Sequence, residues 1–351
     1  MNRYVAALTA ELEMVAGDLS PRTVFFGGGT PSILNFRQWE AILKAFARLG
    51  LLGAQEWTVE CNPATVSLDK AKLWRDHGIN RVSMGVQSLD ETLLERLGRV
   101  HDRQMVFKSF DIFRQAGFQQ INIDLMFAIP GQTMSVWQNT LTEALQLGSE
   151  HLSSYEVIYE EDTALYDQLQ AGQLDVNEEL ACDMYDALVD QAGAAGWAQY
   201  EVANFARSPG GLVNGFPSFA CQHNINYWRG GSFHGLGPSA TGYVRGERTK
   251  NWANTQLYCE QLEKGRRAIE SRETLSSLAR AGETAAFGLR TCPGWPFELF
   301  HDVTGHDLRL EWKQEMETLV QRQWGIRDTE GFRLTRQGLR FADTAAEMFL
   351  R

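Results

Sequence analysis

Short runs rich in β-branched and aromatic residues alternate with longer helical patterns through the first half of the chain. The short runs predict strands over residues 23–26, 56–60, 81–84, 120–126 and 152–158. Between them, apolar residues recur at helical spacing and predict helices over residues 37–49, 68–77, 103–116 and 135–147. Such alternation is typical of a parallel sheet covered by helices.

Residue types that begin and end helices stand at the boundaries of these segments. Ser67, Asp102 and Thr133 each precede a predicted helix and can accept hydrogen bonds from backbone N–H groups of its first turn. Gly78 and Gly117 follow two of the helices, where a left-handed residue commonly ends the last turn. The boundaries therefore agree with the hydrophobic pattern.

The alternation stops at about Ala203. The stretch ANFARSPGGLVNGFPSFACQHN is rich in glycine and proline and predicts a long connecting loop, and a second glycine-rich stretch, WRGGSFHGLGPSATGY, follows it. Beyond Asn251 the pattern is mostly helical and ends in a helix, a short hairpin with its turn at Glu330-Gly331, and another helix. We expect a domain with a helix-covered parallel sheet over residues 1–205, a connection over 206–250 and a helical, winged-helix-like domain over 251–351.

Composition narrows the classes of function. The 351 residues are 44% hydrophobic, enough to bury a full core. A net charge of −11 and the lack of lysine or arginine runs argue against nucleic acid as the main partner. No apolar run approaches the roughly 20 residues that cross a bilayer. The start, MNRYVAALTAELEM, reads as an amphipathic helix rather than a signal peptide, and the five cysteines are scattered, so we expect a cytoplasmic protein.

Polar residues follow the predicted strands at their carboxyl ends, where parallel α/β folds bind ligands. Glycines after the first strand let bare backbone approach a ligand, and Asp124 lies between Ile123 and Leu125, where a carboxylate without a partner is costly to bury. Each residue alone is compatible with a cap or a turn. Together they indicate a site for a ligand with an ammonium, a carboxylate and a ribose diol. The side chains of this set are Glu60, Gln87, Arg99 and Asp124, and the backbone segment beside them is Gly27, Gly28, Gly29 and Thr30.

Six segments in order carry a resemblance to one family: FFGGGTPS, ECNP, RVSMGVQS, LGRVHD, NIDLMFAIPGQT and CQHNINYW. In them the chain resembles radical S-adenosylmethionine proteins of the oxygen-independent coproporphyrinogen III oxidase-like group, from Arg3 to the C-terminus. The resemblance implies an incomplete parallel (β/α) barrel followed by a smaller, mostly helical domain. It also implies that the glycine triplet holds the methionyl ammonium of S-adenosylmethionine and that Glu60, Gln87, Arg99 and Asp124 line this cofactor, with Gln87 and Asp124 on its ribose side.

Two branches share this barrel: oxidases that decarboxylate coproporphyrinogen III, and haem chaperones that bind haem and pass it to an acceptor protein. The segment HNINYW is similar to the HNxxYW pattern of the chaperone branch, which favours a haem-binding protein. It implies His223 as a candidate iron ligand, with Tyr227 and Trp228 packed on the macrocycle. His234 and Cys221 stay open as alternative ligands, and a loop histidine bonded to backbone is the structural alternative.

The CxxxCxxC motif, which holds the 4Fe-4S cluster in this family, is absent from the sequence. Successive cysteines lie at least 33 positions apart (Cys259 to Cys292), whereas three thiolates must converge on one cluster. We therefore expect no cluster and no radical chemistry in the chain as given, with the first barrel strand and the cluster loop missing. A start assigned too far downstream is one explanation, and a shortened relative with only binding functions is the other.

Several functions stay open at this point. A haem chaperone is the main hypothesis, and an oxygen-independent coproporphyrinogen III oxidase and a scaffold without cluster or catalysis are the alternatives. A phosphate-binding barrel enzyme ranks last, because Glu60 and Asp124 would repel an anion bound at the glycine triplet.

Overall fold

The computed structural model describes residues 1–161 and 163–351. The chain divides into two compact units. The first comprises Met1–Gly28, Leu34–Trp57 and Cys221–Arg351, and the second comprises Gly29–Ile33 and Thr58–Ala220. The three-part division predicted from the sequence stays a prediction.

The main sheet is mostly parallel, as the alternating pattern predicts. Its strand order is β1-β2-β3-β4-β5-β7-β6, in which β2 to β5 pair in parallel and β7 runs antiparallel to both β5 and β6. The strands are β1 (Thr23–Phe26), β2 (Glu56–Cys61), β3 (Arg81–Gln87), β4 (Gln120–Phe127), β5 (His151–Glu156), β6 (Trp197–Gln199) and β7 (Asn204–Arg207). The five predicted strands are confirmed, each to within a few residues.

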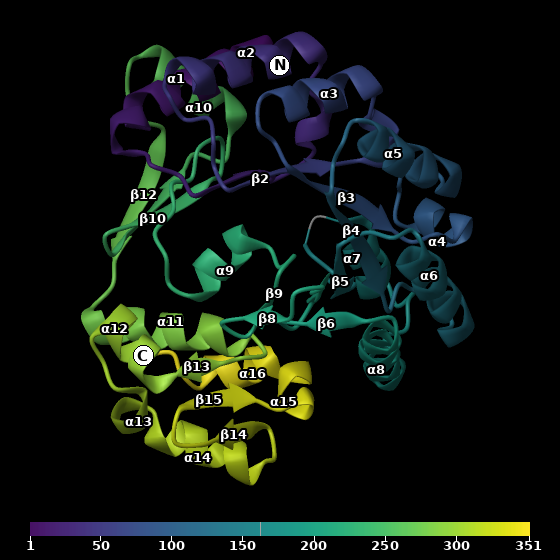
Figure 1. Ribbon diagram of the computed structural model, residues 1–351, viewed down its shortest axis with the longest axis vertical. Coiled ribbons are helices and arrows are strands. Elements are labelled where there is room, and N and C mark those ends of the chain that lie inside the picture. Colours follow the sequence, from purple (N-terminus) through teal and green to yellow (C-terminus); the bar gives the residue numbers. More distant parts are fainter. Residues whose placement is uncertain (162) are drawn as a thin grey trace. The chain divides into compact units, whose positions relative to one another are not determined.

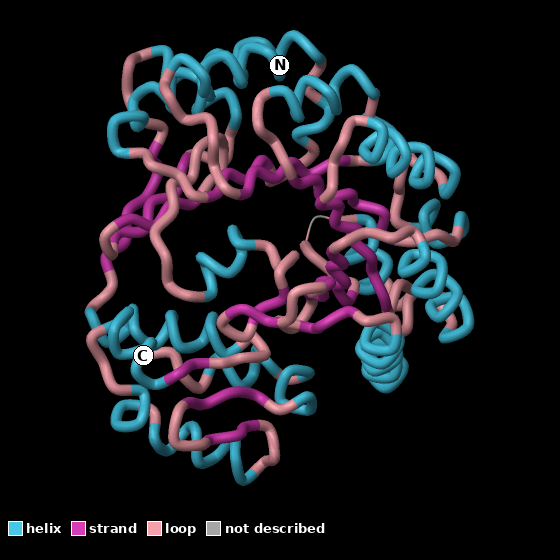
Figure 2. The backbone as a smooth tube through the Cα atoms, in the orientation of Figure 1, coloured by secondary structure: helices cyan, strands magenta, loops and turns pink. Residues whose placement is uncertain are grey.

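In the second unit, helices cover one side of the parallel strands (Figures 1 and 2). Phe127 on β4 packs its ring 5.8 Å from that of Trp137 on α6, so the face of β4 that carries Ile121, Ile123 and Leu125 is the helix-covered face. The covering helices are α3 (Leu68–Asp76), α4 (Glu91–Arg96), α5 (Arg103–Gln115), α6 (Met134–Gln146) and α8 (Glu178–Ala194). The unit also contains α7 (Ala164–Gln170), none of whose residues is buried, and the 3-10 turns η2 (Pro31–Ile33) and η3 (Pro63–Thr65).

The predicted helix boundaries are also confirmed. The side chains of Ser67, Asp102 and Thr133 accept hydrogen bonds from backbone N–H groups in the first turns of α3, α5 and α6. Gly78 and Gly117 have φ values of 96° and 89°, as expected for residues just past the ends of α3 and α5.

Outside its C-terminal region, the first unit contains a buried carboxylate that the hydrophobic pattern does not predict. Glu11 lies inside this unit and accepts hydrogen bonds from the Gly237 backbone, the Asn251 amide and the Tyr258 hydroxyl. These contacts join α1 to a loop, to β11 and to α10. The elements here are α1 (Asn2–Val15), η1 (Ala16–Asp18), α2 (Phe36–Arg48), α9 (Gln222–Trp228), α10 (Thr255–Glu263), β10 (Thr241–Val244), β11 (Glu247–Asn251) and β12 (Ile269–Thr274), the last three forming a small sheet.

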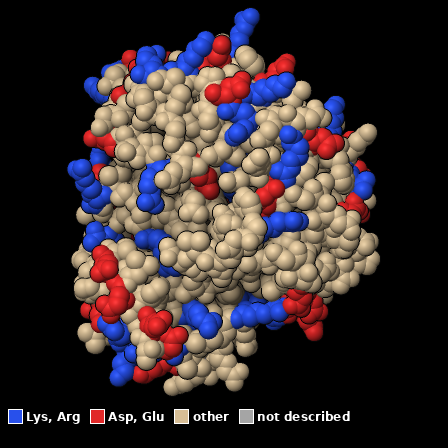
Figure 3. All heavy atoms as spheres, viewed as in Figure 1, with Lys and Arg blue, Asp and Glu red and all other residues tan. Residues whose placement is uncertain are grey.

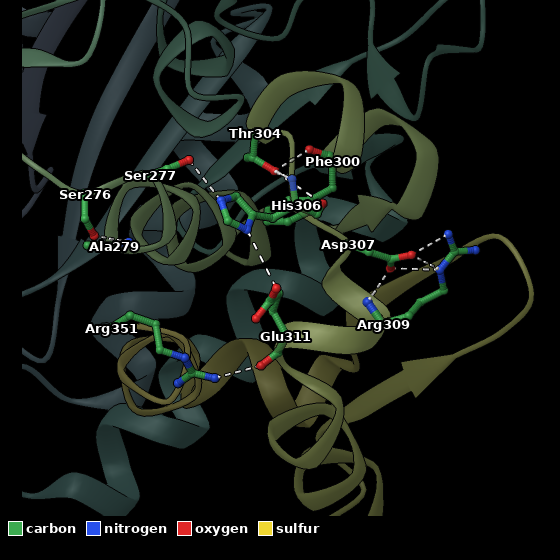
Figure 4. Close-up of polar contacts among 10 residues, drawn as sticks. All are labelled: Ser276, Ser277, Ala279, Phe300, Thr304, His306, Asp307, Arg309, Glu311 and Arg351. Carbon is green, nitrogen blue, oxygen red and sulfur yellow. Dashed lines mark hydrogen bonds and ion pairs between the residues drawn. The ribbon is translucent and has the colours of Figure 1, made fainter.

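The C-terminal region is mostly helical and holds a three-stranded sheet. Asp328 accepts hydrogen bonds from the backbone of Glu330 and Gly331, which closes the predicted hairpin between β14 and β15. Figure 4 shows His306 between Ser277 on α11 and Glu311 on α13. The elements are α11 (Ser277–Leu289), β13 (Trp295–Pro296), α12 (Phe297–Thr304), α13 (Leu308–Glu311), α14 (Lys313–Gln321), β14 (Gly325–Arg327), β15 (Gly331–Leu334), α15 (Arg336–Arg340) and α16 (Ala342–Glu347).

The long loop predicted after Ala203 is wrong. Strand β7 pairs with β5 and β6, and a hairpin of β8 (Leu212–Val213) and β9 (Phe216–Pro217) precedes helix α9. Asn214 and Gly215 connect β8 to β9 with φ values of 51° and 82°, and Asn-Gly is the preferred two-residue hairpin turn. The glycines thus serve turns within regular structure, and sheet pairing outweighs local composition.

Charges of both signs are mixed over the face drawn in Figure 3. Within the described ranges 1–161 and 163–351, no helix is long and apolar enough to cross a membrane.

Candidate functional site

The face of the parallel strands opposite the covering helices carries a row of polar side chains. Glu60 on β2 pairs in register with Ser83 on β3, which pairs with Asn122 on β4 and, through it, with His151 on β5. Asp124 stands two residues beyond Asn122, opposite Gly85. Since side chains alternate between faces along a strand, these residues share one face.

Asp124 has two donors on this face. The Ser83 hydroxyl donates to its Oδ2 at 3.1 Å, and the Asn122 amide donates to its Oδ1 at 2.6 Å. Burial raises the pKa of Asp124, and the hydrogen bonds from Asn122 and Ser83 act in the opposite direction. The carboxylate noted in the sequence as costly to bury therefore has hydrogen-bond partners.

Gln87 ends β3 in a strained turn. Its φ is 66°, and the N–H of Ser88 donates to the carbonyl of Val86 at 2.8 Å, which makes Gln87 the centre of a γ-turn. The β3–β4 register shifts between Gly85 and Gln87 at this point. A side chain on Gly85 would lie 3.1 Å from the Gln87 Nε2, so Gln87 folds back over Gly85, the partner of Asp124.

His101 supports this turn and was not among the predicted site residues. Its Nε2 donates to the Val86 carbonyl at 3.0 Å, and only 3% of the residue is exposed. Burial lowers the pKa of His101 and so favours the neutral ring. The Val86 carbonyl thus accepts from both Ser88 and His101, which uses both of its lone pairs.

Arg99 lies close enough to Asp124 for their opposite charges to interact. Burial lowers the pKa of Arg99, and the negative charge of Asp124 opposes that effect. Glu60, Gln87, Arg99 and Asp124 thus come together in the second unit, although their role as ligand-binding residues stays a prediction.

The glycine triplet needs glycine for its backbone conformation. Gly28 and Gly29 have φ values of 76° and 141°, which side-chain-bearing residues rarely adopt. No atom lies within 4 Å of where a Cβ would stand on either residue, so the space beside them is open. Gly27 and Gly28 belong to the first unit and Gly29 and Thr30 to the second, and their part in a common site stays a prediction.

In the first unit, the HNINYW segment forms helix α9 and is held by a carboxylate. Glu56 on β2 accepts hydrogen bonds from the backbone N–H groups of Gln222 and His223, both at 2.9 Å. The Cys221 thiol lies 3.5 Å from the same carboxylate and is 1% exposed. Enclosed in this way, Cys221 is poorly placed to ligate an iron from outside.

His223 has a side-chain partner at each ring nitrogen. The Thr23 hydroxyl lies 2.9 Å from Nδ1, the Tyr227 hydroxyl lies 2.7 Å from Nε2, and the ring stacks on Phe25 at 5.0 Å. The alternative of a loop histidine bonded to backbone is therefore wrong, because His223 lies in a helix and both ring nitrogens contact side chains. Ligation of iron by Nε2 requires that the bond to Tyr227 opens.

Aromatic rings continue from His223 along this region. Tyr227 packs on Phe233 at 4.4 Å, and burial raises the pKa of Tyr227 to about 12, so its hydroxyl stays protonated. Trp228 is the half-buried last residue of α9. His234 follows Phe233, and burial together with Arg267 lowers its pKa, which favours a neutral imidazole with a lone pair for a metal.

The cysteines do not fit a 4Fe-4S cluster. In the part of the chain that the structure describes, no group of three or more His, Cys, Asp or Glu side chains is arranged to hold a metal ion. Cys61, Cys221 and Cys259 are buried, and Cys61 belongs to the second unit whereas Cys221 and Cys259 belong to the first.

Sequence reasoning missed the residues that support the candidate ligands. Asn122, His151 and Ser153 alternate with apolar residues on their strands. This alternation, with a period of two residues, could have predicted that one face of the sheet is polar. Glu56 and His101 gave no such signal, because their partners are backbone groups far away in sequence.

Comparison with known families gives two matches along the chain. A model of the Radical SAM superfamily matches residues 2–144, and a model of the HemN C-terminal domain matches residues 275–341.

Individual relatives match over most of their length. Heme chaperone HemW of Lactococcus lactis subsp. lactis (strain IL1403) is 33% identical, with 100% of this chain and 90% of that protein covered. Heme chaperone HemW of Bacillus subtilis (strain 168) is 32% identical, with coverage of 96% and 88%. The solved structure of coproporphyrinogen III oxidase (HemN) from Escherichia coli aligns with a TM-score of 0.83 over 99% of this chain and 82% of that one. At 19% identity this last match shows the fold alone.

Proposed function

Because this chain belongs to the HemW branch of the radical S-adenosylmethionine superfamily, we propose that it is a haem chaperone that binds haem and passes it to an acceptor protein. The observation that carries the proposal is the similarity over the whole chain to relatives named heme chaperones. The oxidase alternative has support from the fold alone.

The haem is cargo, and the region around α9 is the proposed place of contact. His223 and His234 are the candidate iron ligands, and the exposed edge of Tyr227, 36% accessible, offers an aromatic surface to the macrocycle. Release of the Tyr227 hydroxyl frees the Nε2 of His223 while Thr23 keeps hold of the Nδ1. A ligating histidine held at its other nitrogen is the usual arrangement in metal sites.

The polar sheet face fits S-adenosylmethionine. Asp124, with both oxygens oriented by donors, accepts from ribose hydroxyls, and Gln87 is aimed over Gly85 at the same place. Glu60 adds negative charge on this face, and the open backbone at Gly28 and Gly29 is suited to the methionyl ammonium. When bound, S-adenosylmethionine supplies a sulfonium nucleoside. No step through a 4Fe-4S cluster is proposed, since the cysteines do not fit one.

Titration with hemin tests the proposal. We expect the wild-type chain to shift and sharpen the Soret band on binding hemin, and substitution of the iron ligand to diminish that band. His223→Ala and His234→Ala are compared with His77→Ala, whose ring bonds a carbonyl of its own helix and serves as the matched control. A wild-type chain that leaves the hemin spectrum unchanged overturns the proposal, and an equal loss in all three variants removes the assignment of the ligand.

A further inference from the structure

A line of hydrogen bonds leads to Asp124 from the β6 edge of the sheet. The Tyr200 hydroxyl lies 2.6 Å from the Nε2 of His151, and the Nδ1 of His151 lies 2.6 Å from the Oδ1 of Asn122. The amide nitrogen of Asn122 then donates both to Asp124 and to Ser83, the latter at 2.7 Å. Tyr200, His151 and Asn122 are each at most 2% exposed.

These bonds have one consistent direction. The Asp124 carboxylate only accepts, so the amide nitrogen of Asn122 faces it and the carbonyl of Asn122 faces His151. The Nδ1 of His151 must then carry the proton, and its Nε2 must accept from Tyr200. Burial, reinforced by Arg81, holds the pKa of His151 well below its usual range, so the ring is neutral and has one such hydrogen. Reversal at any link leaves a buried donor or acceptor without a partner, which is costly.

The network extends beyond what Asp124 alone requires. Ser153 donates to Asn204 at 2.7 Å, and Asn204 in turn donates to Glu201, so the polar line crosses β4, β5 and β7. An apolar interior would stabilise these strands without the cost of desolvating so many polar groups. Polar interiors of this kind are expected where a functional group has to be oriented.

We infer that Tyr200, His151 and Asn122 are positioning residues that orient the Asp124 carboxylate toward the hydroxyl groups of a bound nucleoside. The inference rests on the proposed binding of S-adenosylmethionine. Tyr200 acts through His151 and Asn122, and neither it nor His151 touches the ligand. Loss of the tyrosine hydroxyl leaves the buried Nε2 of His151 without a donor, so the ring is held only through its Nδ1 and fixes the Asn122 amide, and through it Asp124, less firmly.

Calorimetric titration with S-adenosylmethionine tests this series of hydrogen bonds. Tyr200→Phe is expected to weaken binding about fivefold, the effect of one lost hydrogen bond. Ser83→Ala, which removes a direct donor to Asp124, is expected to weaken it by a similar factor. The matched control is Tyr185→Phe, because the Tyr185 hydroxyl also donates a hydrogen bond in this unit, to the carbonyl of Val202, but takes no part in the line of contacts from Tyr200 to Asp124. The affinity of Tyr185→Phe for S-adenosylmethionine is expected to stay within twofold of the wild-type value.

Nitrogen NMR of His151 supplies a readout that a merely structural role would not move. We expect the proton on Nδ1 in the wild type and in both variants, and a shifted resonance of the unprotonated Nε2 in Tyr200→Phe alone, because only there does that nitrogen lose its donor. A proton on Nε2 in the wild type, or equal affinities of Tyr200→Phe and Tyr185→Phe, overturns the inference. A wild type that does not bind S-adenosylmethionine overturns the proposed ligand instead, and this outcome is distinguishable because the variants are compared only where the wild type binds.

Discussion

At the scale of single residues, the left-handed Gln87 shows how local strain is held at the candidate site. A side-chain-bearing residue at a φ of 66° costs about 1–3 kcal/mol and persists only where its surroundings enforce that conformation. His101 and Ser88 provide that enforcement through the Val86 carbonyl. Gln87 itself was predicted from its motif, whereas His101 was not, because its contact spans 15 positions of sequence.

Substitution of His101 tests this support. His101→Leu removes one of the two donors to the Val86 carbonyl, which keeps the N–H of Ser88, and is expected to lower the free energy of unfolding by about 0.5–1.5 kcal/mol. His101→Gln keeps a donor and is expected to lose less. Denaturant unfolding of the two variants measures the difference, and equal loss in both would contradict a role through this hydrogen bond.

The shifted pKa of His101 makes the stability of the folded state depend on pH. Burial holds the pKa of His101 below its usual value, so the folded state binds fewer protons than the unfolded state as the pH falls through about 6.5. Stability from this group is present above that pH and is lost below it. His101→Gln is therefore expected to lose less stability than the wild type between pH 7 and pH 5 in thermal melts. A steeper loss in the variant would contradict the assigned direction.

At the scale of elements, helix α9 depends on a carboxylate from another part of the first unit. Glu56 accepts from the first backbone N–H groups of α9, while no side chain of the helix caps its own N-terminus. Period and composition predicted neither the helix nor its cap, because both depend on the packing of β2 against this segment. By contrast, the caps of α3, α5 and α6 are local in sequence and were predicted correctly.

Substitution of Glu56 distinguishes the effect of its hydrogen bonds to α9 on stability from the effect of removing a negative charge elsewhere. Glu56→Gln keeps one acceptor oxygen but loses the charge, so we expect a loss of about 1–2 kcal/mol in the free energy of unfolding. The matched control is Glu40→Gln, which removes an exposed ion pair with Lys44 and should change stability by less than about 0.5 kcal/mol. Similar values for the two variants in denaturant titrations would remove Glu56 as the anchor of α9.

At the scale of the whole molecule, the fold class was largely predictable and the supporting contacts were not. Parallel strands and their covering helices follow from hydrophobic period and helix boundary residues, which are local signals. The buried Glu11 and the polar line from Tyr200 to Asp124 are assembled from residues distant in sequence, so a single sequence holds no local trace of their partners. The resemblance carried by six ordered motifs led to the family, which composition alone did not indicate.

Thermal unfolding of the wild-type chain with and without hemin tests the central claim most directly. A ligand that binds only the folded state at 100 times its Kd stabilises it by about 2.7 kcal/mol. We predict a rise in Tm that grows with hemin concentration, accompanied by a Soret band from the same sample at one hemin per chain. An unchanged Tm across the titration, with hemin spectra identical to those of free hemin, would contradict the account.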